Sequence, residues 1–246
     1  MSFRARGDQA PQNGPWIMTD GLYKFPHTPH LLWLGPGTPR EDKVLRPNEV
    51  AEFLAGEVIV EEKVDGANLG ISLAPDGRLR AQSRGSFLAP GRSHAQWNLL
   101  WPWIAEHRVA LEEGLQGGLI LFGEWCYARH SVPYDALPDW FLAFDLFETN
   151  SRRFWSADRR NEWLKGRDVV PIPEVKRARL LENQIPTLLG LSRVGPVTME
   201  GIYLRREQDG WLQARAKVVS QGFRHQIEEH WSRRALLPNR LATVHV

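Results

Sequence analysis

The chain has 246 residues, of which 42% are hydrophobic and 24% charged, a composition typical of a folded globular protein and not of a disordered or fibrous one. Its single cysteine, Cys126, excludes a disulfide framework and a thiolate zinc cluster, and no apolar run reaches the length of a membrane span, so we expect a cytoplasmic protein. The net charge of +2 divides into −4 for residues 1–175 and +6 for residues 176–246. A basic surface there would suit a polyanion such as nucleic acid, although a solvated surface without a partner would show the same asymmetry.

The first 50 residues are rich in proline and show little periodicity, which predicts an irregular segment packing on a body formed by residues 51–246. The body begins with a short apolar strand at 58–60. Alternating apolar residues then predict a hairpin over residues 69–81, turning at Asp76-Gly77.

Further along the chain, helical spacing and strand-like runs follow one another. The spacing predicts helices at 95–113, 156–164, 178–191 and 222–237, the last of them a short amphipathic C-terminal helix, and strands at 119–127, 140–148, 197–205 and 211–219. Hairpins with separate helices favour an α+β fold with antiparallel sheets, not a doubly wound parallel sheet.

The chemistry-bearing segment is Glu62-Lys63-Val64-Asp65-Gly66, at the edge of a predicted strand. No Walker loop and no glycine-rich dinucleotide fingerprint accompanies it. A lysine acts as a nucleophile only when neutral, so its pKa must be lowered by burial or by nearby cations such as Lys217 or a bound Mg²⁺. Alone, the tetrapeptide Lys-x-Asp-Gly would equally suit a surface turn.

Five further segments follow in order on the other predicted elements. They are Ser83-Arg84-Gly85, Phe122-Gly123-Glu124, Phe141 to Asp145, Met199-Glu200-Gly201-Ile202 and Arg215-Ala216-Lys217. Together with the lysine segment they resemble the ordered motifs of the covalent lysine nucleotidyltransferases, which include ATP-dependent RNA ligases, DNA ligases and mRNA capping enzymes. The block at 122–125, Glu62 directly before the lysine and the segment 23–32 are most similar to RNA ligases of the bacteriophage RNA ligase 2 type.

The resemblance implies an α+β nucleotidyltransferase (ATP-grasp-like) domain of antiparallel sheets flanked by helices. Only 29 residues follow Lys217, so we expect no appended oligonucleotide-binding barrel. It also implies an ATP-dependent RNA ligase that uses Mg²⁺ or Mn²⁺ and seals 3′-OH to 5′-phosphate RNA ends through a lysyl-AMP and an RNA-adenylate. An end-healing kinase or phosphatase is a possible partner.

The resemblance also implies a role for each matching residue. Lys63 would be the nucleophile, with Arg215 and Lys217 assisting at the α-phosphate. The nucleotide would contact Glu62, Arg84, Glu124, Phe144, Glu200 and Lys217, with Phe144 stacking on the base and Glu124 accepting from the ribose hydroxyls. Arg84, Arg205 and Arg206 would contact RNA, and Glu200 and Asp65 would hold the metal.

Two alternatives remain open from the sequence. One is a DNA ligase or a GTP-using capping transferase, which the short C-terminal extension argues against. The other is a nucleic-acid-binding relative without catalysis, which the intact lysine and both glutamates disfavour. Arg215 stands where phage-type enzymes usually have lysine, which keeps the charge but replaces a point contact with a planar fork.

Overall fold

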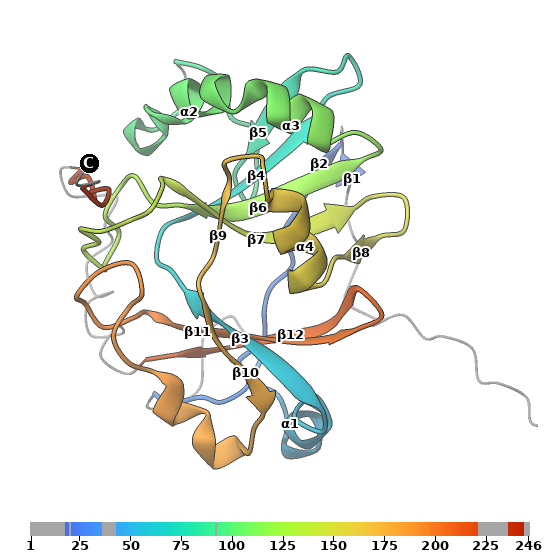
Figure 1. Ribbon diagram of the computed structural model, residues 1–246, viewed down its shortest axis with the longest axis vertical. Helices are drawn as coiled ribbons and strands as arrows, with labels where there is room; N and C mark the ends of the chain where they lie inside the picture. Colours follow the sequence, from blue (N-terminus) through green and yellow to red (C-terminus); the bar gives the residue numbers. More distant parts are fainter. Residues whose placement is uncertain (1–17, 20, 36–42, 92, 221–235, 244–246) are drawn as a thin grey trace, which may run out of the picture.

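The computed structural model describes residues 18–19, 21–35, 43–91, 93–220 and 236–243. Two β-sheets form its two main layers, and the candidate site lies between them (Figure 1). Apart from one short parallel pairing, between β7 and β9, the strand pairs within these sheets are antiparallel. The expected α+β fold with antiparallel sheets is confirmed.

The larger sheet has six strands, and it carries the predicted hairpin. Its order is β5 (Leu79–Gln82), β4 (Ala67–Leu73), β6 (Leu119–Trp125), β7 (Phe141–Glu148) and β8 (Arg153–Phe154), with β9 (Val170–Pro171) beside β7. Gly77 adopts φ +80° at the turn from β4 to β5, a left-handed conformation that glycine takes without strain. The Asp76 carboxylate accepts from the Arg78 amide, which completes the turn.

The smaller sheet has four strands in the order β10 (Glu174–Arg179), β3 (Glu57–Lys63), β11 (Gly201–Gln208) and β12 (Trp211–Val219). The helix predicted at 178–191 is wrong. Residues 174–179 pair with β3 instead, and two 3₁₀ turns follow, η2 (Glu182–Gln184) and η3 (Pro186–Leu188). Charged residues protect an exposed edge strand from further pairing, so β10 lacks an apolar strand signal, and Pro186 interrupts any helix after it.

Helices cover the outer faces of the two sheets, except for the one that follows β8, which lies between the sheets (Figure 1). They are α1 (Pro47–Phe53), α2 (Leu100–Glu106), α3 (Arg108–Gly114) and α4 (Ala157–Leu164), with the 3₁₀ turn η1 (Ala95–Trp97). The helix predicted at 95–113 is therefore broken into three pieces. The helix predicted at 156–164 is confirmed, and the Ser156 side chain caps it by accepting from the Arg159 amide.

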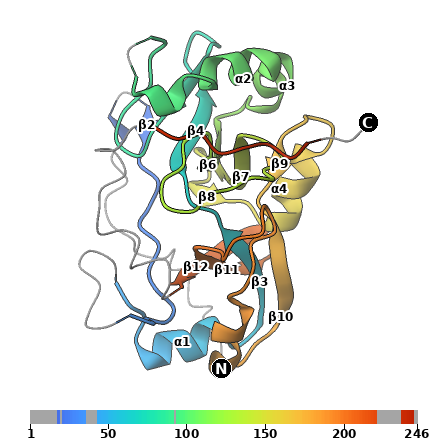
Figure 2. The ribbon, with the colours of Figure 1, turned by 90° about the vertical axis from the view of Figure 1, so that its left-hand side faces the viewer.

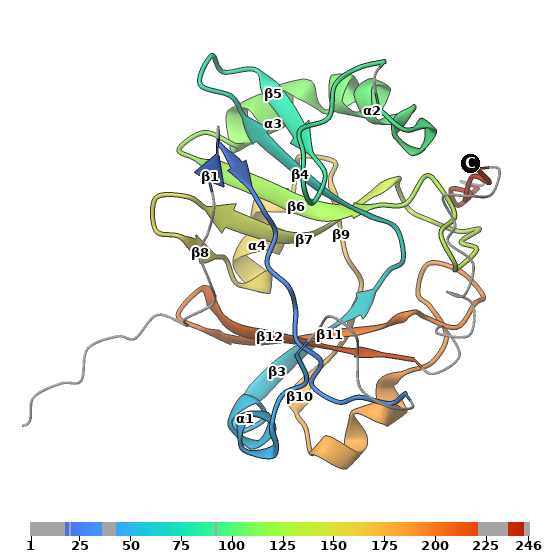
Figure 3. The same ribbon diagram turned by 180° about the vertical axis from the view of Figure 1, so that it is seen from behind.

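The described N-terminal segment forms the short pair β1 (Met18–Thr19) and β2 (Leu22–Tyr23) and then runs extended from the larger sheet to the smaller one, as the view from behind shows (Figure 3). Figure 2 shows both layers edge-on with this blue segment beside them. At the other end, residues 236–243 pair with the loop that follows β6. The predicted C-terminal helix at 222–237 falls almost wholly outside the described residues. No helix among the described residues is both long and apolar enough to cross a membrane.

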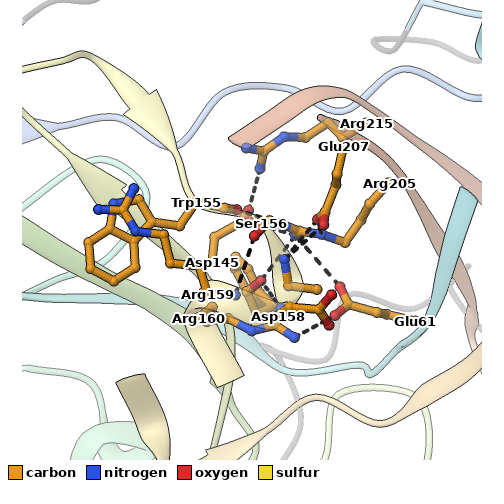
Figure 4. Close-up of polar contacts among 12 residues, drawn as sticks. Glu61, Asp145, Trp155, Ser156, Asp158, Arg159, Arg160, Arg205, Glu207 and Arg215 are labelled. Carbon is orange, nitrogen blue, oxygen red and sulfur yellow. Dashed lines mark hydrogen bonds and ion pairs between the residues drawn. The ribbon is translucent and has the colours of Figure 1, made fainter. Parts of the chain in front are cut away.

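A buried network of charges joins the two sheets (Figure 4). Arg205 on β11 donates to Asp145 on β7 at 2.7 Å and lies 3.6 Å from Glu61 on β3. Arg160 on α4 donates to the other Glu61 oxygen at 2.6 Å, and Arg215 on β12 donates to Asp145 at 2.5 Å. Ion pairs thus connect elements of both sheets. Burying a pair of charges costs free energy, and leaving one buried charge without its partner costs more.

This network generates the first testable expectation. Arg160→Leu leaves the Glu61 carboxylate, which is 2% exposed, without its 2.6 Å partner, so we expect a loss of about 3–5 kcal/mol in the free energy of unfolding. Urea denaturation measures it. Arg159→Leu, one residue away on α4, removes an arginine paired at the surface with Glu148 at 3.7 Å and should cost about 1 kcal/mol or less. Equal losses in the two variants would contradict the expectation that the buried pair of Arg160 and Glu61 stabilises the fold more than the surface pair of Arg159 and Glu148.

Candidate active site

The two sheets enclose a cleft of about 400 Å³, a size suited to a nucleotide. Of the residues predicted for the site, it is lined by Lys63, Arg84, Glu124 and Phe144. Five further side chains line it that were not among the predicted site residues: Phe25, Asn68, Gln96, Trp97 and Tyr203. Residues distant in sequence therefore meet at one cavity.

Lys63 is the last residue of β3 and reaches the cleft from the smaller sheet. Its register partner on β11 is Gly201, directly after Glu200, so the lysine and this glutamate meet at the same end of neighbouring strands. Lys63 Nζ donates to Glu200 Oε2 at 2.6 Å, and their side chains are 17% and 8% exposed. The amine also lies 5.8 Å from the centre of the Tyr203 ring.

Burial and charge act against each other at this pair. Burial alone would lower the pKa of Lys63, but the Glu200 carboxylate, with Tyr203 and Glu124 nearby, raises it above its usual value. Burial raises the pKa of Glu124 to about 8 and that of Glu200 to about 7, against the attraction of Lys63. The ligand-free site therefore holds the lysine charged, and the carboxylates outweigh the depressing effect expected from Lys217.

The loop after Lys63 is fixed by contacts of Gly66 and Asp65. A Cβ on Gly66 would lie 2.6 Å from the Trp125 carbonyl oxygen, so close packing, and not an unusual backbone angle, requires glycine here. Asp65 Oδ2 accepts from the amides of Ser131 and Val132 at 2.7 and 2.9 Å. This carboxylate serves as an anchor for the loop, which argues against the metal-binding role predicted for Asp65.

Glu62 does not line the cleft, contrary to the expectation that it reads the adenine edge. Successive side chains on a strand face opposite sides, so Glu62 points away from Lys63. It is fully buried and accepts from Ser192 Oγ at 2.5 Å and from the Arg193 amide at 2.8 Å. Its carboxylate ties the segment 192–193 to β3.

Arg215 and Lys217, the two cationic residues predicted to assist at the α-phosphate, have different surroundings. Arg215 is held by Asp145 and lies over the rings of Phe154 and Phe25, at 4.0 and 4.8 Å from their centres. Lys217 lies opposite Tyr203 in the β11–β12 register and lowers the pKa of Glu200 by its charge. Lys217 therefore acts on the carboxylate beside Lys63, whereas Arg215 is bound by Asp145.

Three arginines were predicted to contact RNA. Arg84 is exposed at the cleft, in a position that fits the prediction. Arg205 is 4% exposed and its guanidinium donates to Asp145, Glu207 and the Trp155 carbonyl, so no surface remains for RNA. Arg206 lies five residues beyond Gly201 on β11 and donates to the Glu52 carbonyl at 2.5 Å. The RNA contact expected of Arg205 is incorrect for this structure.

Two of the residues that sequence reasoning missed carry a recognisable signal. Tyr203 lies two residues after Gly201 on one strand, hence on the face that also carries Arg205. Asn68 is paired with Glu124 in the β4–β6 register, and its buried Oδ1 has no hydrogen-bond partner in the structure. Strand alternation applied outward from each motif would have placed Tyr203, and Phe25 lies in the segment 23–32 that carries part of the resemblance. No sequence motif includes Gln96 or Trp97.

A comparison with protein-family models shows to which family the chain belongs. The family model described as RNA ligase matches residues 56–219, about two-thirds of the chain and the part that holds the predicted motifs. The chain belongs to the RNA ligase family. A search of curated proteins finds no match.

Solved structures of RNA ligases show the same fold. The Naegleria gruberi RNA ligase with PPi is 21% identical and superposes with a TM-score of 0.60 over 84% of this chain and 64% of that one. A mutant form of the Naegleria gruberi enzyme with ATP and Mn is 20% identical, with a TM-score of 0.57 over 74% and 55%. The chain thus spans between half and two-thirds of those longer chains. An oligonucleotide-binding barrel is not seen among its described residues.

The raised pKa of Glu124 generates a prediction about the stability of this protein. Between about pH 4.5 and pH 8 the folded state keeps a proton that the unfolded state releases, so stability falls as the pH rises through this window. Glu124→Gln removes that penalty. We expect its Tm to equal that of the wild type near pH 5 and to exceed it by a few degrees near pH 9, where each kcal/mol corresponds to about 2–4 °C.

Scanning calorimetry at the two pH values measures the difference. Glu113→Gln, at an exposed position of α3, is the control for loss of a carboxylate. A lower Tm for Glu124→Gln at the higher pH would show that Lys63 and Glu124 form a net stabilising pair instead.

Proposed function

We propose that this RNA ligase family member is an ATP-dependent RNA ligase of the bacteriophage RNA ligase 2-like group, joining 3′-OH and 5′-phosphate RNA ends through an AMP linked to Lys63. The observation that carries the proposal is the buried Lys63 amine, which faces Glu200 and Glu124 in a cavity of nucleotide size. We extend the proposal to a nucleotidyltransferase domain at 51–246, an N-terminal segment at 1–50, a cytoplasmic location and an end-healing kinase or phosphatase as partner.

The cleft offers a distinct place to each part of ATP. Phe144 and Tyr203, from the two opposing sheets, provide aromatic surfaces for the adenine. The Glu124 carboxylate can accept from the ribose hydroxyls, and Arg84 and Lys217 supply positive charge for the phosphates. A solved structure of the Naegleria enzyme contains ATP and Mn, which supports this choice of nucleotide.

The first chemical step forms a bond between Lys63 Nζ and the α-phosphorus of ATP and breaks the bond from that phosphorus to the bridging oxygen, releasing pyrophosphate. The Lys63 ammonium loses two protons in this step: one passes to Glu200 Oε2, its hydrogen-bond acceptor at 2.6 Å, before the attack, and the second leaves the nitrogen as the bond forms and departs with pyrophosphate. The RNA 5′-phosphate then attacks the α-phosphorus and frees Lys63, and a 3′-hydroxyl finally displaces AMP. In our proposal Lys63 alone carries the covalent intermediate.

The residues at the cleft also fit a divalent cation, provided that the nucleotide shares in holding it. Glu124 and Glu200 place two carboxyl groups beside a single lysine, and burial raises the pKa of both, so a divalent cation bound there would favour their ionised forms. No cluster of three or more His, Cys, Asp or Glu that could hold a metal occurs in the described part of the chain, so phosphate oxygens and water must complete the ligand set. Bound there, Mg²⁺ or Mn²⁺ would neutralise carboxylate and phosphate charge.

The rival functions differ from this proposal in their nucleotide and nucleic acid. A capping transferase would form lysyl-GMP, a DNA ligase would seal nicked DNA, and a non-catalytic relative would form no adduct. The match to the RNA ligase family favours RNA sealing over the first two. The buried lysine and carboxylates favour catalysis over binding alone, because a binding module has no need of a desolvated amine.

Incubation with Mg²⁺ and either ATP or GTP, followed by intact-mass spectrometry, tests the proposal. We expect a gain of one AMP from ATP and no gain from GTP. Lys63→Arg should abolish this gain, since a guanidinium stays protonated, whereas Lys165→Arg, at an exposed position, should leave it unchanged.

The adenylylated protein is then given nicked duplex RNA, single-stranded RNA and nicked DNA. We expect sealing of RNA by the wild type and none by Lys63→Arg with 5′-phosphate ends. A GMP adduct, or an AMP adduct that persists in Lys63→Arg, would contradict the proposal.

A further inference from the structure

A strap at the N-terminal side of the chain completes the cleft. Residues 21–31, called here the strap, lie outside the segment 56–219 that the family model matches. In Figure 3 the strap runs from the larger sheet to the smaller sheet, and Phe25 within it lines the cleft. The family match alone therefore assigns it no function.

The strap is tied to both sheets, and each anchor lies near the site. At the larger sheet, Gln82 Nε2 donates to the Tyr23 carbonyl at 2.6 Å, and the Tyr23 ring stacks on Phe147 with 3.9 Å between ring centres. At the smaller sheet, the Lys217 amide donates to the Pro29 carbonyl at 2.9 Å, and the Leu31 amide donates to the Lys217 carbonyl at 2.8 Å. The strap thus fixes the backbone of Lys217 through both its amide and its carbonyl.

Between these anchors the strap carries Phe25 into the wall of the cleft. Phe25 is 4% exposed, and its ring meets the Phe144 ring edge to face at 5.2 Å. The Arg215 guanidinium covers it at 4.8 Å from the ring centre. Phe25, Phe144 and Tyr203 all line both the cleft and a small apolar recess behind it. The three rings come from the strap, the larger sheet and the smaller sheet.

We propose that Phe25 is a nucleotide-binding residue, the third aromatic wall of a purine site whose other walls are Phe144 and Tyr203, and that the strap is a functional part of that site. This inference rests on the proposed function. A flat purine gains most from rings that meet it at face and edge, and Phe25 also fixes the ring plane of Phe144 by its edge-to-face contact. The strap thus places both the Phe25 ring and the backbone of Lys217 around one nucleotide.

The test compares two buried rings of the strap that belong to one aromatic cluster. Phe25 lines the cleft, whereas Tyr23, at 2% exposure, does not, so Tyr23→Leu is the matched control for lost packing. Single-turnover formation of lysyl-AMP is followed over a range of ATP concentrations, below the Tm of both variants. For Phe25→Leu we expect the half-saturating ATP concentration to rise roughly three- to ten-fold, as loss of one aromatic contact implies.

Tyr23→Leu should lower the Tm but keep the half-saturating concentration of the wild type, and Phe25→Tyr, which retains the ring, should also keep it. As a readout on the wild-type protein, NMR should show contacts between the Phe25 ring protons and the adenine H2 or H8 of α,β-methylene-ATP. Equal shifts in Phe25→Leu and Tyr23→Leu, or no ring contact with the adenine, would overturn the inference. Absence of any lysyl-AMP in the wild type would instead overturn the proposed function.

Discussion

The ion pair between Lys63 and Glu200 is the interaction on which the rest of the site depends. Its atoms are 2.6 Å apart in a cavity where burial penalises charge, and the second carboxylate, Glu124, adds to the field that keeps the lysine protonated. A charged lysine cannot attack phosphorus. In the mechanism that we propose, the amine becomes reactive only when nucleotide and cation compensate the charge of the carboxylates.

The architecture serves that pair by bringing two sheets to a fixed separation. Lys63 ends a strand of the smaller sheet and Glu200 directly precedes another, whereas Glu124 and Phe144 belong to the larger sheet. The buried charges of Figure 4 hold the layers together on the inner side, and the strap of residues 21–31 also connects them. A network of paired charges is directional, so it fixes the relative position of the sheets more strictly than apolar packing alone would.

Much of the fold followed from local patterns, and the errors have physical causes. Asp76-Gly77 specified its hairpin because the turn needs a left-handed glycine, and the ordered motifs identified the strands that meet at the cleft. The edge strand β10 was missed because its charges oppose the apolar strand pattern. Glu62 and Lys63 were assigned to one site although strand alternation sends them to opposite faces. The burial of Arg205 depends on acids from distant elements, and no local pattern reveals such partners.

The most direct measurement of this account is the titration of the Lys63 amine by NMR in protein labelled at the lysine side chains, with Lys63→Arg to assign the signal. The account predicts that Lys63 stays protonated to above its usual pKa of about 10.4 in the ligand-free protein. It also predicts that Mg²⁺ with α,β-methylene-ATP lowers this pKa. A lysine already neutral near pH 8 without nucleotide would contradict the account.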